Sequence, residues 1–118
     1  MEKKITYKLT VRLFTEEKCF GPGVAMLLHR VQEYHSLRAA AASLSMAYSK
    51  AWTILKNAER LMNCQLLLST TGGRHGGGAT LTDEAVALLA AYDSFCSDLS
   101  DYGEQIFEEK FAYFIDKL

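Results

Sequence analysis

Apolar and polar side chains alternate along residues 4–14. A period of two places successive side chains on opposite faces, so this segment predicts a half-buried β-strand with one face toward a core. The apolar face consists of Ile5, Tyr7, Leu9, Val11 and Leu13, and the opposite face has the cations Lys4, Lys8 and Arg12.

The segment Gly21-Pro22-Gly23 ends this alternation, and apolar residues then follow with helical spacing. Residues 24–34 predict a first helix, and Pro22 suits its first turn because that position needs no backbone N–H. Ser36 predicts the N-terminal cap of a short, alanine-rich helix over 37–44, which a neighbouring helix can approach closely.

A turn at residues 45–47 leads to a third predicted helix over 48–62, so that residues 36–62 form a helix-turn-helix. The inner side of this third helix is expected to pack against the first two helices. Trp52 is expected in the core, because a large indole is usually covered. The inner stripe consists of Ala51, Leu55, Ala58 and Met62.

The segment 82–118 has a heptad-like apolar seam that is longer than a small domain needs for its own core. Thr82 is expected to cap its helix, and Gly103 is expected to kink or end that helix before a last short one. The seam begins one residue before this segment, at Leu81, and continues with Ala85, Leu88, Tyr92, Phe95, Leu99, Tyr102 and Ile106. From Leu88 onward the seam is the predicted interface of a homodimer.

Five of the chain's eight glycines fall within residues 72–78, between two short apolar runs. We interpret residues 66–81 as a two-stranded hairpin, or wing, with the glycines at its tip. Arg74 and His75 are candidates for contact with the minor groove of DNA, where A·T-rich segments attract arginine. The alternatives are a hairpin that binds nothing and a phosphate-binding loop, but no Gly-Lys-Ser/Thr follows the glycines.

The 118 residues suffice for one globular domain, and no signal peptide or membrane-spanning run is visible, so we expect a cytoplasmic protein. Residues 29–80 contain six Lys or Arg against two acids, whereas residues 81–118 contain two against nine. A basic middle fits one nucleic-acid-binding face, although an ordinary solvated surface gives the same counts. Cys19, Cys64 and Cys96 are expected to be reduced thiols, and no metal site or cofactor is expected.

In chain order these elements make a mainly α winged helix-turn-helix with small β: an N-terminal strand, a two-stranded wing and a long C-terminal dimerisation helix. In such a fold the helix after the turn enters the major groove of double-stranded DNA. Tyr48 either donates to a phosphate or packs inward, and Arg38 either reaches the DNA backbone or pairs with a surface acid. The cations of the third helix either contact DNA or form a solvated face. The predicted DNA-binding residues are Ser36, Arg38, Tyr48, Ser49, Lys50, Thr53, Lys56, Asn57, Arg60, Arg74 and His75.

Several short motifs are spread over nearly the whole chain. They are Phe20-Gly21-Pro22-Gly23, Ser36-Leu37 with Ala39-Ala40, Tyr48-Ser49-Lys50-Ala51-Trp52, the glycine-rich wing with Leu81-Thr82, and Leu88-Leu89 with Tyr92. Together they resemble the N-terminal DNA-binding domain of the ModE family of molybdate-responsive transcriptional regulators. A looser resemblance is to the winged helix of LysR-type regulators.

The chain departs from the ModE pattern at two positions. Ala47 stands where that family usually has a serine, so the third helix is expected to lose about 1 kcal/mol of capping energy. Ala85 stands where the family usually has a glycine.

The resemblance implies a homodimeric, sequence-specific regulator of transcription that binds double-stranded DNA. The family's C-terminal molybdate-binding domains have no counterpart here, so molybdate binding is not expected within this chain. The alternative is a dimerising accessory protein that pairs with a regulator or another partner through its C-terminal helices and binds DNA weakly. An enzyme has little support, because no Cys–His or Ser–His pair has a recognisable local frame.

Overall fold

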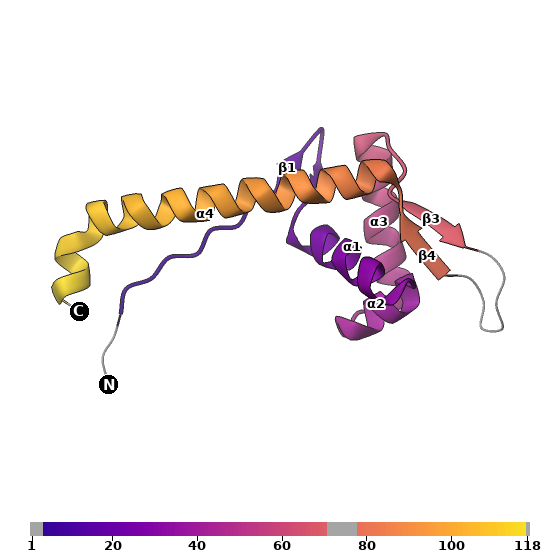
Figure 1. The fold of residues 1–118 in the computed structure, drawn as a ribbon, viewed down its shortest axis with the longest axis horizontal. Helices are drawn as coiled ribbons and strands as arrows, with labels where there is room; N and C mark the ends of the chain where they lie inside the picture. The colour runs from indigo at the N-terminus through magenta and orange to yellow at the C-terminus, as the bar shows by residue number, and fades with distance from the viewer. Residues whose placement is uncertain (1–3, 71–77, 118) are drawn as a thin grey trace.

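The structure, a computed structural model, describes residues 4–70 and 78–117. Within these residues, one long helix crosses a small body made of three shorter helices and two hairpins (Figure 1). This architecture is the predicted mainly α winged helix-turn-helix. Its elements are β1 (Leu13–Phe14), β2 (Lys18–Phe20), α1 (Pro22–Tyr34), α2 (Leu37–Ser43), α3 (Tyr48–Met62), β3 (Leu67–Thr70), β4 (Gly78–Leu81) and α4 (Asp83–Lys117).

The core lies where α1 meets α2, α3, β2 and the first turns of α4. Leu27, Leu28 and Val31 of α1 are fully buried, and Phe20 and Leu66 fill the space beside them. Burial of each such side chain contributes about 2 kcal/mol. The packed body therefore contacts the buried side of α3 and fixes the direction of this helix.

The ends of the helix-turn-helix elements follow the local signals in the sequence. The Oγ of Ser36 accepts a hydrogen bond from the N–H of Ala39 at 3.1 Å, which confirms the predicted cap of α2. α3 begins at Tyr48, as predicted. The residue before it, Ala47, has a methyl side chain and so makes no capping hydrogen bond.

The wing is an antiparallel pair, β3 with β4, and it is attached to the end of α1. The N–H of Ala79 donates to the carbonyl of His35 at 2.9 Å. A Cβ on Gly78 would lie 2.7 Å from that same carbonyl oxygen, so this position needs a glycine. The predicted tip contacts Arg74 and His75 lie outside the described residues.

The prediction of a strand over residues 4–14 is wrong for all but its last two residues. Residues 4–12 are extended but pair with no strand in the described part of the chain. They lie along α4 (Figure 1), where the rings of Tyr7 and Phe107 have centroids 4.9 Å apart. Except at Leu9, the alternation does correspond to one-sided burial, but the covered face rests on a helix. A sheet also requires a neighbouring strand, which alternation alone does not supply.

α4 has 35 residues and is about 52 Å long. Thr82 caps it by accepting from the N–H of Ala85 at 3.0 Å, as predicted. The predicted kink at Gly103 is wrong, because the helical geometry is interrupted instead at Phe111. A Cβ on Gly103 would lie 2.7 Å from the Tyr7 hydroxyl, so this glycine makes room for the N-terminal segment. The far half of α4 projects from the body, and the molecule measures 60 × 34 × 21 Å.

Candidate nucleic-acid interface

α3 has one buried face and one broad exposed face. Ala51, Leu55 and Ala58 are buried toward the other helices. A helix turns by about 100° per residue, so the opposite face contains Ser49, Thr53, Lys56 and Arg60. All the predicted DNA-binding residues of α3 are exposed: Tyr48, Ser49, Lys50, Thr53, Lys56, Asn57 and Arg60.

Trp52 lies on the exposed face and not in the core, which corrects the prediction. Its side chain is 49% exposed. It lies about 100° around the helix from Ala51 and so falls outside the buried stripe. The Nζ of Lys56 is 5.7 Å from the indole ring centroid, which is a cation–π contact. Hydrophobicity alone misplaced this residue, whereas its angular position along α3 would have identified it as a surface residue.

Arg38 of α2 lies over the ring of Tyr48 at the start of α3. The guanidinium carbon is 4.3 Å from the ring centroid. Tyr48 is exposed, so the alternative in which it packs inward is wrong. Among the described residues no carboxylate forms an ion pair with Arg38. Its charge is therefore presented together with the tyrosine hydroxyl at one end of α3.

A cleft of about 460 Å³ separates this side of α3 from the wing strands. Ser36 also reaches the cleft, although its Oγ already accepts the capping bond of α2. Cations and aromatic rings lie on one wall and hydroxyls on the other, and all of these groups are used to contact phosphates or base edges. The wall residues include Arg38, Tyr48, Trp52 and Lys56, opposite Ser69 and Thr70 of β3.

Two cations of α3 have acidic neighbours in the chain. The Nζ of Lys56 is 3.2 Å from Oε1 of Glu59. The Nη2 of Arg60 is 3.7 Å from Oε2 of Glu17, in the turn between β1 and β2. Lys50 has no such partner among the described residues. Lys50 and Arg38 are therefore the cations of this surface whose charge is least compensated.

Glu59 joins α3 to the start of the wing, a role that sequence reasoning missed. Its Oε2 accepts from the backbone N–H of Leu66 at 2.7 Å and of Leu67 at 3.3 Å. Burial by itself would raise the pKa of Glu59. The hydrogen bonds from Leu66, Lys56 and Leu67 and the charge of Lys56 outweigh it, so this pKa lies below its usual value of 4.5. No motif signals this bond, because the partners meet only in the folded chain.

Replacing Glu59 with glutamine is expected to lower the free energy of unfolding by about 1–2 kcal/mol at neutral pH, because two backbone donors lose a charged acceptor. A carboxylate with a lowered pKa stabilises the fold fully above its unfolded pKa and loses this effect as pH falls through the folded value. In urea unfolding, the difference in the free energy of unfolding between Glu59→Gln and the original chain should therefore be smaller at about pH 3 than at neutral pH.

Glu33→Gln is the matched control for this measurement, because Glu33 is exposed on α1 and its side chain forms no hydrogen bond or ion pair with another described residue. A difference between Glu59→Gln and the original chain that stays constant from neutral to acidic pH would contradict the assigned role.

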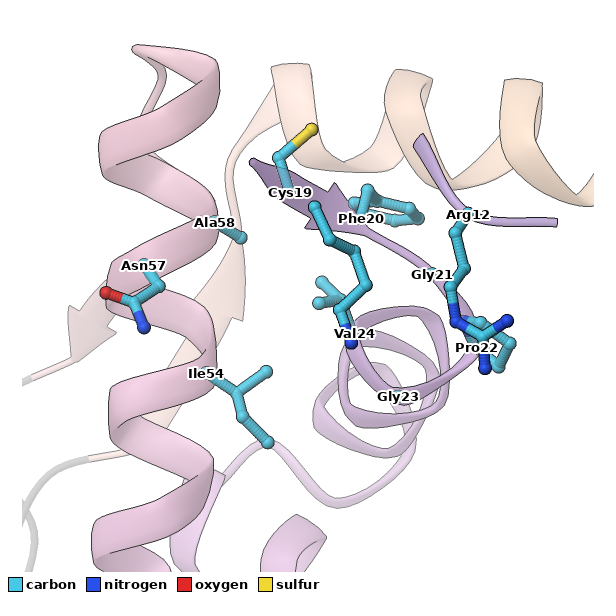
Figure 2. A pocket seen from close by; sticks show the side chains of 11 residues that line it. Arg12, Cys19, Phe20, Gly21, Pro22, Gly23, Val24, Ile54, Asn57 and Ala58 are labelled. Atoms are coloured by element: carbon cyan, nitrogen blue, oxygen red, sulfur yellow. The ribbon is translucent and has the colours of Figure 1, made fainter. Parts of the chain in front are cut away.

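On its other flank, α3 borders a cavity of about 390 Å³, formed with β2 and the start of α1. Figure 2 shows Ile54 and Asn57 on the α3 side, with Arg12 and Pro22 across from them. Asn57 borders this cavity and does not border the wing cleft. The exposed face of α3 thus has two flanks: Trp52 lies on the one beside the wing cleft, and the predicted DNA-binding residue Asn57 lies on the other.

The predicted dimer residues of α4 fall into two groups. Tyr92 belongs to the chain's own core: its ring contacts Phe20 edge to face at 5.0 Å between centroids, and its hydroxyl donates to the carbonyl of Val11 at 2.7 Å. Leu88 is half-buried against the same core. These two side chains are thus used inside the chain. The rest of the predicted interface lies on the projecting part of α4: Phe95, Leu99, Tyr102 and Ile106.

The described ranges 4–70 and 78–117 contain no helix that is long and apolar enough to cross a membrane. In the same ranges no group of three His, Cys, Asp or Glu side chains is placed to hold a metal ion. The thiols of Cys19, Cys64 and Cys96 are free.

The family model of the bacterial regulatory helix-turn-helix proteins of the lysR family matches residues 25–86. This match covers more than half of the chain, from α1 to the first turn of α4. It includes the helix-turn-helix and both wing strands, which are the elements that build the cleft described above.

Three curated relatives are similar to most of this chain. The molybdenum transport protein ModE of Herbaspirillum seropedicae is 34% identical over 91 residues, which are 77% of this chain and 30% of that protein. The transcriptional regulator ModE of Haemophilus influenzae is 35% identical over 89 residues, 75% of this chain and 33% of that protein. The DNA-binding transcriptional dual regulator ModE of Escherichia coli K12 is 30% identical over 89 residues, 75% and 32% respectively.

The chain spans about a third of the length of these relatives. The similarity supports the resemblance seen in the sequence motifs, since it covers the helix-turn-helix domain. The chain belongs to the lysR family of bacterial regulatory helix-turn-helix proteins, and its helix-turn-helix domain is of the ModE type.

Proposed function

We propose that this chain binds double-stranded DNA as a symmetric homodimer and regulates transcription. The observation that supports this most is the exposed face of α3, which is polar and basic and lies beside the wing cleft. A helix of this kind fits the major groove, which is about 12 Å wide. Because the relatives are named for molybdenum transport and for transcriptional regulation, we propose genes of molybdenum handling as the targets.

Within this proposal most side chains of the interface bind phosphates, since phosphate and sugar receive at least half of the hydrogen bonds in protein–DNA complexes. Arg38 and Lys50 have the least compensated charge and are the proposed phosphate anchors. On binding, Lys56 and Arg60 would leave their acidic neighbours and contact DNA instead. A two-fold dimer places two copies of α3 in successive major grooves, about 34 Å apart, which predicts a roughly palindromic site.

The proposal is tested by titrating the protein with DNA from upstream of its own gene at several salt concentrations, with and without molybdate. Neutralising about six phosphates or more releases counterions, so we expect affinity to fall by about 10³ or more between roughly 50 and 200 mM salt. Molybdate is expected to leave the affinity unchanged. A duplex affinity that does not depend on salt, or no binding to any duplex, would contradict the proposal.

Trp52 is the one tryptophan of the chain, so its fluorescence reports directly on α3. We expect DNA to cover the half-exposed indole and to reduce its quenching by acrylamide several-fold. Trp52→Phe should retain the fold and most of the affinity, whereas Trp52→Ala should weaken binding by about 1–2 kcal/mol through lost apolar contact and a lost Lys56 neighbour. Unchanged acrylamide quenching at saturating DNA would remove this flank of α3 from the interface.

A dimerising accessory protein is the second candidate. It is favoured by one observation, the exposed aromatic side chains on the last turns of α4: Phe111, Tyr113 and Phe114. Large exposed apolar patches often mark protein contacts. This candidate predicts weak, non-specific DNA binding by the isolated chain, so the same salt titration separates the two functions.

A further inference from the structure

Residues 4–12 form an extended segment whose backbone is mostly unpaired. Among the described residues, the hydrogen bond that reaches this backbone comes from the Tyr92 hydroxyl to the carbonyl of Val11. Pairing with β2 begins only at Leu13. An extended segment with unpaired N–H and C=O groups is a template to which another strand can add.

The surface beside this segment is the uncovered seam of α4. The segment lies over the side of α4 that holds Gly103 and Phe107. The residues of the uncovered seam lie about 100° around the helix from that side, because each of them precedes a residue of that side by one position. They are Phe95, Leu99, Tyr102 and Ile106. A cleft of about 310 Å³ between the segment and α4 is bordered by Leu9 and Cys96. A strand added to this edge would cover the seam.

The charges of this region favour a second copy of the same chain as the partner. Lys4, Lys8 and Arg12 are exposed, and no ion pair joins them to a carboxylate in the described part of the chain. Two copies of α4 brought together along their seams repel each other unless cations lie nearby, and segment 4–12 of each copy supplies three. The exposed acids of α4 beyond the core are Asp98, Asp101, Glu104, Glu108, Glu109 and Asp116.

We propose that residues 4–12 of two copies pair as antiparallel strands across the two-fold axis, with Leu9 of one copy opposite Leu9 of the other. The paired strands then cover both α4 helices, and their apolar faces lie on the two seams. This inference rests on the proposed function as a homodimer and adds the surface that joins the copies.

The register follows from the side-chain pattern. A register centred between two residues sets the apolar face of one strand against the basic face of the other. A register centred on Lys8 sets Lys8 against its own copy, which is destabilising. Tyr7 is already engaged with Phe107 and Gly103. Leu9, in contrast, is 52% exposed, and a register centred on it sets each Lys8 opposite an uncharged Thr10.

Disulfide trapping tests this register. Antiparallel neighbours have Cα atoms about 4.5–5.5 Å apart, within reach of a disulfide. Leu9→Cys is compared with Thr10→Cys, both in a Cys96→Ala background, because Cys96 borders the same cleft and would compete. In the proposed register the two copies of residue 10 have Cα atoms about 8 Å apart, which is too far for a disulfide.

Under mild oxidation we expect most of the Leu9→Cys protein to run as a covalent dimer on a non-reducing gel, and the Thr10→Cys protein and the background to run as monomers. Sedimentation and DNA titration of the unmodified chain accompany the gel. A non-covalent dimer that binds DNA but shows no preference for cross-linking at residue 9 would overturn the strand pairing and leave the proposed function intact. A monomer in sedimentation would overturn both the strand pairing and the homodimer.

Discussion

Reversing the charges of Arg38 and Lys50 to glutamate is expected to lower the affinity for the DNA site at least about 100-fold at roughly 0.1 M salt. Both side chains are exposed and have no carboxylate partner among the described residues. In the proposed complex they neutralise phosphates, so their loss also reduces the slope of log affinity against log salt by about one for each contact removed. A factor of 100 corresponds to about 2.7 kcal/mol of binding free energy.

The matched control for this variant is Lys110→Glu with Lys117→Glu. It lowers the net charge by the same amount but places the change at the far end of α4, away from α3 (Figure 1). We expect its affinity to remain within a few-fold of the original. Equal losses in the two double variants would mean that binding depends on net charge alone and not on the surface of α2 and α3. Thermal unfolding and sedimentation of both variants check that the fold and the proposed dimer are retained.

The elements that sequence reasoning placed correctly are those with local causes. Pro22, Ser36 and Thr82 act through neighbours within a few residues, so helix starts are visible in the sequence itself. The heptad-like spacing after Thr82 likewise predicted a helix. For the same reason α3 begins and ends where its apolar period begins and ends.

The errors arose where the outcome depends on contacts between distant segments. Residues 4–12 alternate like a strand, but whether they join a sheet depends on a neighbour elsewhere. Gly103 is a flexible residue by itself, yet here it is the contact point for Tyr7. Glu59 is an ordinary helical glutamate in sequence and becomes an anchor only when Leu66 folds beside it. Trp52 is a different case, because its error does not depend on distant contacts. Its angular position on α3 indicates a surface residue, whereas its hydrophobicity favours burial and led to the wrong prediction.

The candidate site was therefore predicted more completely on α3 than elsewhere. Exposure of its polar face follows from helical periodicity, which is local. The cleft between Trp52 and the wing strands depends on the attachment of Ala79 to His35, which no motif signals. The division of the α4 seam between a buried part and an exposed part also depends on how far the body extends along the helix.

Replacing Phe95 with aspartate is expected to separate the proposed homodimer into monomers at micromolar concentration and to weaken binding to the proposed palindromic site by about 10²–10⁴-fold. Phe95 is 52% exposed in the single chain, so the folded protomer tolerates the change. In the proposed dimer the same position lies in the seam, where a buried, unpaired carboxylate is strongly unfavourable. The large loss of DNA affinity arises because a linked second protomer binds its half-site at high effective concentration, and a monomer does not.

Ser97→Asp is the matched control, since it adds the same charge to α4 two residues away, at an exposed position outside the seam. Sedimentation should show Ser97→Asp as a dimer and Phe95→Asp as a monomer. Binding to a single half-site should then be nearly equal for the two variants, because α3 is unchanged in both. If Phe95→Asp remains a dimer, the copies are joined through another surface and the seam is not the interface. If it becomes a monomer that binds the full palindrome as tightly as the original chain, the two-fold arrangement of α3 in successive grooves is wrong.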